Sequence, residues 1–186
     1  MSYPERIQKQ IASQKEVFED LFQGVEAARM KQRPSPKRWN SLECVEHINM
    51  TLRYYISEIN KSIGKAKQKG QRPNEDYRPG FVGERFARWL APRDGVVKGK
   101  VRTFPSFNPQ KGPSTVGVEV LDEFKLYMDE LAGLAAESAS VDLDKTRVRS
   151  AIGNILRFKL GDAFPIVLAH NERHLLQARK ALEAAR

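Results

Sequence analysis

Three histidines are the residues of this chain most suited to chemistry, and two of them, His170 and His174, stand four residues apart near its end. At about 100° per helical residue, His174 is turned by roughly 40° from His170, so both imidazoles project from one face and can bind one ion. The charged residues of this segment lie elsewhere around the helix. The same face otherwise carries small and apolar residues: Ala163, Val167, Ala178 and Ala181. We therefore expect the pair to point into the protein.

Two buried imidazoles need polar partners, because an unsatisfied buried polar group costs roughly 1–3 kcal/mol. A metal ion would satisfy both, and His47 is the natural third ligand if its helix packs beside theirs. The alternative is a surface or hydrogen-bonded pair to which His47, at the border of its own apolar stripe, is unrelated. Cys44 is expected in the core. Glu172 follows His170 by two residues, which differs from the HExxH motif of zinc proteases.

Apolar residues that recur every three or four positions predict four long helices to hold these histidines. Ser2 and Asn40 each precede a glutamate by three residues, as in a capping box. Asp162 is a plausible N-cap of the last helix, with Pro165 in its first turn. The predicted ranges are about 3–31, 41–68, 118–138 and 162–185. Strand alternation of any length is absent, so the expected fold class is all-α, a four-helix bundle.

The connection between the second and third helices, about 70–118, is long and interrupted by six prolines between positions 70 and 114. We predict one short helix in it, at 81–90. Residues 139–161 are predicted to form a loop that could contain a short helical turn. With 186 residues, the chain is expected to form a single domain over 1–186, in which 70–118 is an elaborated crossover rather than a second core.

Composition excludes several classes of protein. Hydrophobic residues make up 40% and charged residues 30%, as in ordinary globular proteins and unlike disordered chains. The single cysteine excludes a scaffold stapled by internal disulfides. No apolar run approaches the roughly 18–20 residues of a membrane span, and the first residues lack the apolar stretch of a signal peptide. We therefore expect a cytoplasmic protein and no membrane partner.

The positive charge of the chain is concentrated in one segment. Lys and Arg number 32 and Asp and Glu 23, a difference of +9; residues 61–111 contain 13 basic and 4 acidic residues, which is again +9. This segment also contains five aromatic residues: Phe81, Phe86, Trp89, Phe104 and Phe107. It could cover a metal site and bind an anionic substrate, or be a solvated flap. A non-enzymatic protein that binds nucleic acid or another anionic partner through 61–111 is the alternative function, although no recognised nucleic-acid motif is present and we expect nucleic acid not to be the partner.

Two blocks of sequence resemble the DinB/YfiT-like superfamily. They are KRWNSLECVEHINMTLRYY (37–55), with Trp39, Glu43 and His47, and LGDAFPIVLAHNERHLLQARKAL (160–182); VDLDKTRVRS (141–150) is also similar. The resemblance implies a four-helix bundle, often dimeric, with a divalent metal bound by one histidine of the second helix and two of the fourth. It thus implies His47, His170 and His174 as ligands. Relatives include metal-dependent transferases that use thiols such as bacillithiol or mycothiol, a maleylpyruvate isomerase, and proteins labelled as metal-dependent hydrolases.

Three neutral imidazoles leave coordination positions open, as in catalytic metal sites. Such an ion lowers the pKa of a bound water to about 7 or holds a thiol as thiolate. Together with the resemblance, this chemistry leads us to expect a metal-dependent S-transferase that uses a low-molecular-weight thiol, or a hydrolase, with a small-molecule substrate. The resemblance also implies a homodimeric assembly. Imidazole ligands do not select among Zn, Ni, Fe and Mn. Three residues could orient the imidazoles from outside, namely Glu43, Asn171 and Gln177, and no catalytic residue is assigned.

Overall fold

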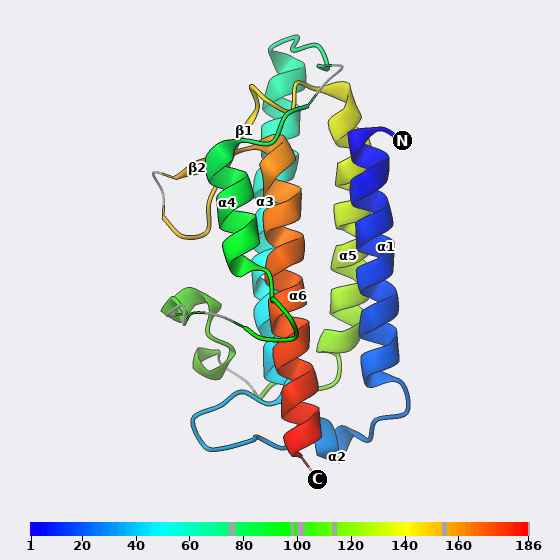
Figure 1. The fold of residues 1–186 in the computed structure, drawn as a ribbon, viewed down its shortest axis with the longest axis vertical. Helices are drawn as coiled ribbons and strands as arrows, with labels where there is room; N and C mark the ends of the chain where they lie inside the picture. Colours follow the sequence, from blue (N-terminus) through cyan, green and yellow to red (C-terminus); the bar gives the residue numbers. More distant parts are fainter. Residues whose placement is uncertain (75–76, 98, 100–102, 113–114, 154–155, 186) are drawn as a thin grey trace.

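Four long helices lie side by side along most of the molecule in the computed structural model (Figure 1). The structure describes residues 1–186 except 75–76, 98, 100–102, 113–114, 154–155 and 186. The four helices are α1 (Tyr3–Phe22), α3 (Ser41–Gln68), α5 (Val120–Glu137) and α6 (Leu160–Ala184). Helices α3 and α5 run in one direction and α1 and α6 in the other, because the long crossover returns the chain before α5 begins. The all-α class and the bundle are confirmed.

Side chains from all four long helices form one hydrophobic core. Helix α3 packs against α5 and α6, and α1 packs against the same two helices on the other side. Phe18 of α1 stacks on Phe124 of α5 with ring centroids 4.1 Å apart. Fully buried aliphatic residues such as Ile48, Leu52 and Ile59 occupy one stripe of α3, as the sequence periodicity predicts. Close packing of this stripe fixes the axial position of α3 relative to α6, and therefore of the histidines they carry.

The predicted helix over 3–31 is wrong in its last third. Helix α1 ends at Phe22, and a single turn, α2 (Ala27–Met30), follows after a break. Gly24 lies in the break with a φ of 69°, a left-handed conformation that favours glycine and ends helices. The two predicted capping boxes are present, at Ser2 and at Asn40. The prediction of 41–68 for the second long helix is confirmed.

The crossover between α3 and α5 contains the predicted short helix, α4 (Phe81–Leu90), which packs against α6. Two turns of 3-10 helix follow, η1 (Pro105–Phe107) and η2 (Pro109–Lys111), and both contact α3. In Figure 1 this part of the chain lies mainly along the α3 and α6 side of the bundle, and it also touches the start of α1, where Tyr77 packs on Tyr3 with ring centroids 4.6 Å apart. Within the described residues, no helix is long and apolar enough to cross a membrane.

The prediction of a loop over 139–161 missed a small antiparallel hairpin. After the turn η3 (Ser138–Ser140), strand β1 (Arg147–Arg149) pairs with strand β2 (Arg157–Lys159). Each strand buries its central residue, Val148 or Phe158, and turns its two flanking cations outward. Strands of three residues are too short to show alternation in the sequence, which is why the hairpin was not predicted.

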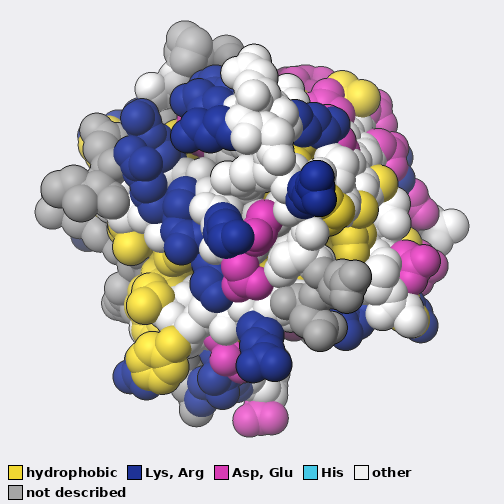
Figure 2. All heavy atoms as spheres, turned by 90° about the horizontal axis from the view of Figure 1, so that it is seen from above, with side chains coloured by type: hydrophobic (Ala, Val, Ile, Leu, Met, Phe, Trp, Pro, Cys, Tyr) yellow, Lys and Arg dark blue, Asp and Glu magenta, His cyan; other side chains and the backbone are white. Residues whose placement is uncertain are grey.

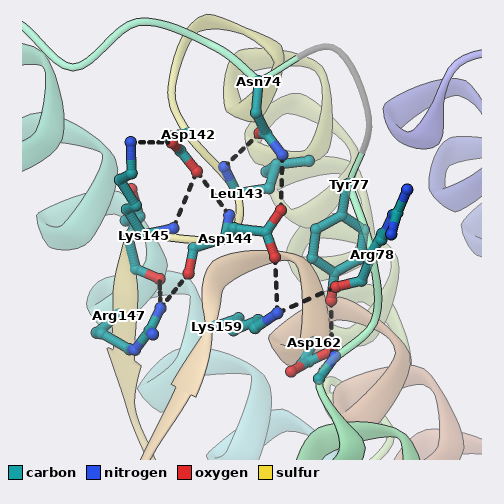
Figure 3. A network of polar contacts seen from close by, with 12 residues as sticks. Asn74, Tyr77, Arg78, Asp142, Leu143, Asp144, Lys145, Arg147, Lys159 and Asp162 are labelled. Carbon is teal, nitrogen blue, oxygen red and sulfur yellow. Dashed lines mark hydrogen bonds and ion pairs between the residues drawn. The ribbon is translucent and has the colours of Figure 1, made fainter.

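Helix α6 begins at Leu160, two residues before the predicted N-cap. Asp162 therefore lies inside the first turn, where its buried carboxylate accepts hydrogen bonds from the Tyr77 hydroxyl and from the Gly80 N–H, the latter at 2.9 Å (Figure 3). Gly80 is the N-cap residue of α4. Asp162 thus accepts a hydrogen bond from a backbone N–H at the beginning of α4 and does not cap its own helix.

A polar network holds the segment after α3 against the start of α6 (Figure 3). The Asn74 amide donates to Asp144 at 2.8 Å and accepts from the Leu143 N–H at 2.9 Å. Lys159 joins Asp144 at 2.6 Å to the carbonyl of Arg78 at 3.2 Å. These hydrogen bonds fix the position of the first residues of the crossover relative to the bundle.

Two helical glycines give a matched test of this packing. A Cβ on Gly83 of α4 would overlap the Asp162 carboxyl group, whereas a Cβ on Gly64 of α3 would meet nothing within 4 Å. We expect Gly83→Ala to lower the free energy of unfolding by about 1–3 kcal/mol through this overlap. Gly64→Ala should raise it by about 0.5–1 kcal/mol, because alanine has the higher helix propensity. Urea unfolding measures both, and equal effects of the two substitutions would contradict the close approach of α4 to α6.

Candidate metal centre

All three histidines of the chain meet between α3 and α6. His47 lies in the second turn of α3 and is 6% exposed; His174 of α6 is 8% exposed, and His170 is partly buried. Each offers one ring nitrogen, and these three atoms lie within 4.8 Å of one another. Because α3 and α6 are antiparallel neighbours, the start of one meets the middle of the other. Sequence spacing alone did not decide whether His47 lies beside His170 and His174, and the structure brings all three together.

The distance between the imidazoles matches the size of a bound ion. Nε2 of His170 lies 3.2 Å from Nε2 of His47. Two nitrogens that each bind a tetrahedral ion at about 2.0–2.1 Å stand roughly 3.3 Å apart. The ring of His174 lies 4.3 Å from that of His47 and 4.5 Å from that of His170, measured between centroids. The three rings therefore surround one point.

A backbone carbonyl orients His47. The Phe107 oxygen, in η1, lies 2.7 Å from Nδ1 of His47. A carbonyl only accepts, so this hydrogen bond assigns the proton to Nδ1 and leaves the lone pair of Nε2 facing His170. Such a contact through the second ring nitrogen is usual for metal-binding histidines. The role of Phe107 was not predicted, because a main-chain acceptor leaves no signal in residue types.

An aromatic ring packs beside the imidazoles. The Trp39 ring lies 4.9 Å from that of His47 and 6.1 Å from that of His174, and Tyr54 contacts the Phe107 ring at 6.0 Å, all between centroids. The remaining crossover aromatics lie elsewhere: Phe86 stacks on Phe158, while Phe81, Trp89 and Phe104 are exposed. Only the η1 region of the crossover therefore covers the histidines by the described contacts.

Two of the three residues that could orient the imidazoles from outside, Glu43 and Asn171, form contacts with other residues instead. Glu43 completes the α3 capping box and binds Arg33, with Nε to Oε2 at 3.1 Å. The Asn171 amide donates to Met128 Sδ at 3.4 Å. Gln177, by contrast, acts on the His174 imidazole by raising its pKa, which opposes the effect of burial.

Cys44 lies in the core as predicted, and burial raises the pKa of its thiol to about 12. A thiol so reluctant to ionise is a poor metal ligand. The donor set at this site therefore consists of imidazoles.

Burial keeps the imidazoles neutral. It lowers the pKa of His47 to about 4, against the opposing effect of the Phe107 carbonyl. Burial first, and then the neighbouring imidazoles, also lower the pKa of His170 and of His174. The buried guanidinium of Arg173 adds to the decrease, and its own side chain donates to the carbonyls of Leu90 and Gly99. Neutral rings keep the lone pairs that metal binding requires.

Two ring nitrogens at this site have no protein partner. Among the described residues, Nδ1 of His170 and Nδ1 of His174 are buried and form no hydrogen bond. Such groups are costly inside a protein, and on His170 the atom that faces the cluster is the other ring nitrogen, Nε2. Three clustered, neutral and incompletely satisfied imidazoles fit a divalent metal ion, and the arrangement is able to hold one.

The depressed pKa values predict how the metal-free protein responds to acid. The unfolded chain binds protons at histidine near pH 6.5, whereas His47 of the folded chain does so only toward pH 4, and burial also lowers the pKa of His170 and of His174. The free energy of unfolding should therefore fall as the pH falls through this window, by up to about 1.4 kcal/mol per pH unit for each imidazole. Urea unfolding with chelator measures the slope. His47→Gln should flatten it, and an unchanged slope in that variant would contradict the assignment.

The comparison with known proteins agrees with this fold and this cluster. The model of the DinB superfamily matches residues 10–178. No curated protein and no solved structure matches the chain. The match spans most of the chain, from the middle of α1 to the last turns of α6, and includes all three histidines. The chain therefore belongs to the DinB superfamily.

Proposed function

We propose that this protein is a metal-dependent enzyme in which His47, His170 and His174 hold one divalent ion. The observation that supports the proposal most strongly is the convergence of three neutral imidazoles from α3 and α6 on one point, two of them buried and one partly buried. A bound ion supplies Lewis acidity, which lowers the pKa of a thiol or of a water. The proposed reaction is transfer of a low-molecular-weight thiol to an electrophilic substrate, with hydrolysis as the second option.

The residues of the chain decide how strong that acidity is. Neutral imidazoles leave the full charge of a divalent ion uncompensated, whereas carboxylate ligands would reduce it. The Phe107 carbonyl holds the His47 ring in the required tautomer. The Trp39 ring packs beside the His47 and His174 rings, the Phe107 carbonyl contacts His47, and both limit the access of water. Each of these features favours a thiol or water that ionises at neutral pH.

Thiol transfer is favoured over hydrolysis by the surroundings of the imidazoles. A hydrolase normally uses a carboxylate or a histidine as general base beside the ion. Among the described residues, the groups that act on the three imidazoles are each other, Phe107, Gln177 and Arg173, and Glu43 is bound to Arg33. A thiol that binds directly as thiolate needs no such base.

A cavity of about 790 Å³, which is the size of a small-molecule pocket, is lined by residues that are close in sequence to the site, although none of the three histidines lines it. Glu43 in its wall lies one turn before His47, and Pro109 lies two residues after Phe107. Lys31 and Arg33 also line it. These cations support the proposal that the substrate or thiol carries an anionic group.

Metal binding tests the first part of the proposal. Protein purified without a histidine tag should contain about one divalent ion per chain, measured by elemental analysis after exhaustive dialysis. His170→Ala should lose the ion and keep its helical circular dichroism. Cys44→Ala is the matched control, since Cys44 lies one turn from His47 but is expected to contribute no ligand. Equal retention of metal by both variants would contradict the site.

Turnover tests the second part. The metal-loaded protein should accelerate conjugation of a low-molecular-weight thiol to an electrophilic aromatic acceptor. His174→Ala should lower the rate by more than about 100-fold at unchanged fold. Hydrolysis of ester or amide substrates with no thiol-dependent product would instead favour the second option, and metal binding without either reaction would contradict the enzymatic proposal.

A further inference from the structure

The hairpin places like charges directly opposite each other on its exposed face. Arg147 pairs with Lys159 and Arg149 with Arg157 across the two strands, while Val148 and Phe158 point into the core. Like charges in this relation destabilise a sheet. Both outward-facing pairs consist of two cations, which indicates that the positive charge of this surface has a role of its own.

One of the two pairs is compensated within the chain. Lys159 binds Asp144 at 2.6 Å, and Arg147 donates to the Asp144 carbonyl. Among the described residues, no carboxylate forms an ion pair with Arg149 or Arg157. Both guanidinium groups are exposed. This second pair is therefore available to an external anion.

The start of α4 adjoins the hairpin and adds exposed apolar side chains to its cations. Phe86 of α4 stacks on Phe158 of β2 with centroids 5.5 Å apart, so helix and hairpin form one packed unit. Phe81 is 77% exposed and Val82 is 60% exposed. Arg78 and Arg85, both exposed, flank them in the sequence.

The hairpin also combines exposed cations with exposed apolar side chains. Ile152 is 41% exposed and Leu156 is 38% exposed, and they lie just beyond Arg149 and Arg157. Figure 2 looks onto this end of the molecule: Lys and Arg side chains lie across much of it, a group of hydrophobic side chains lies at its lower left edge, and acidic side chains lie mainly toward the right, with a few at the centre and the bottom. Cations and large apolar side chains thus share one surface, which we call the cationic end.

We propose that the cationic end binds the surface of an anionic lipid bilayer. Arg78, Arg85, Arg149 and Arg157 would contact lipid headgroups, and Phe81, Val82, Ile152 and Leu156 would enter the interface. Exposed apolar patches of this kind mark interaction sites, and juxtaposed cations and apolar side chains are what an anionic bilayer surface attracts.

Aliphatic side chains favour a bilayer over nucleic acid as the partner. Phe81 could stack on a base, but Val82, Ile152 and Leu156 have no comparable contact in a nucleic acid, whereas all four have one in lipid. Surface binding needs no spanning helix. The expectation of no membrane partner rested on the lack of a spanning run in the sequence, which does not bear on contacts at the surface.

Vesicle sedimentation tests the proposal. The full chain should sediment with vesicles of equal parts phosphatidylcholine and phosphatidylserine and not with phosphatidylcholine alone, and added salt should weaken the binding. The double variant R149Q/R157Q should bind about 30-fold more weakly, from roughly fivefold per cation. Its thermal stability should be unchanged or higher, because the like-charge pair is removed. F81S/V82S should also bind at least about tenfold more weakly.

Matched variants elsewhere on the surface serve as controls. R38Q/R179Q removes two exposed arginines outside the cationic end, and Leu126→Ser removes a side chain of α5 that is 57% exposed. Both should bind vesicles as the parent chain does. Equal weakening by R38Q/R179Q would overturn the proposal in favour of non-specific charge attraction. Binding of single-stranded oligonucleotides with no binding of vesicles would overturn it in favour of nucleic acid, and binding of neither would overturn it outright.

Discussion

Burial of three imidazoles against one another is the constraint on which the rest of this structure depends. Nε2 of His47 and Nε2 of His170 stand 3.2 Å apart, so a shift of α3 along α6 by one residue, about 1.5 Å, would break the arrangement. The hydrophobic stripe of α3 prevents such a shift. Ile48, Leu52 and Ile59 lie on the same helix as His47 and are fully buried. The apolar surroundings therefore position the polar cluster. Burial of this cluster lowers the free energy of unfolding unless the rings share a ligand.

The parts of the fold that the sequence predicts well are those governed by local rules. Helix α3 has the predicted bounds because Asn40 and Glu43 cap it reciprocally and its apolar residues keep one period for its whole length. The convergence of His170 and His174 follows from their spacing of four on α6. His47 lies at the border of the apolar stripe of its own helix, so the packing of α3 on α6 decides its position.

The parts that the sequence does not predict depend on contacts between distant segments. Asp162 has the right residue type for an N-cap, but its carboxylate serves Gly80 and Tyr77 of the crossover while its own helix begins two residues earlier. The period of α1 continues past Phe22, yet Gly24 turns the chain. The carbonyl of Phe107 reaches His47 from a segment of prolines and short turns that has no period at all.

The crossover contacts the bundle both beside the histidines and at points far from them. Asp162 fixes the start of α4, Arg173 holds the carbonyls of Leu90 and Gly99, and Phe107 contacts His47. The last of these links is chemically special. A cation on Nε2 of His47 withdraws electron density from the ring and makes Nδ1–H a stronger donor. A metal bound there would therefore strengthen the hydrogen bond between His47 and the Phe107 carbonyl, and that hydrogen bond keeps Nε2 of His47 free to hold a metal.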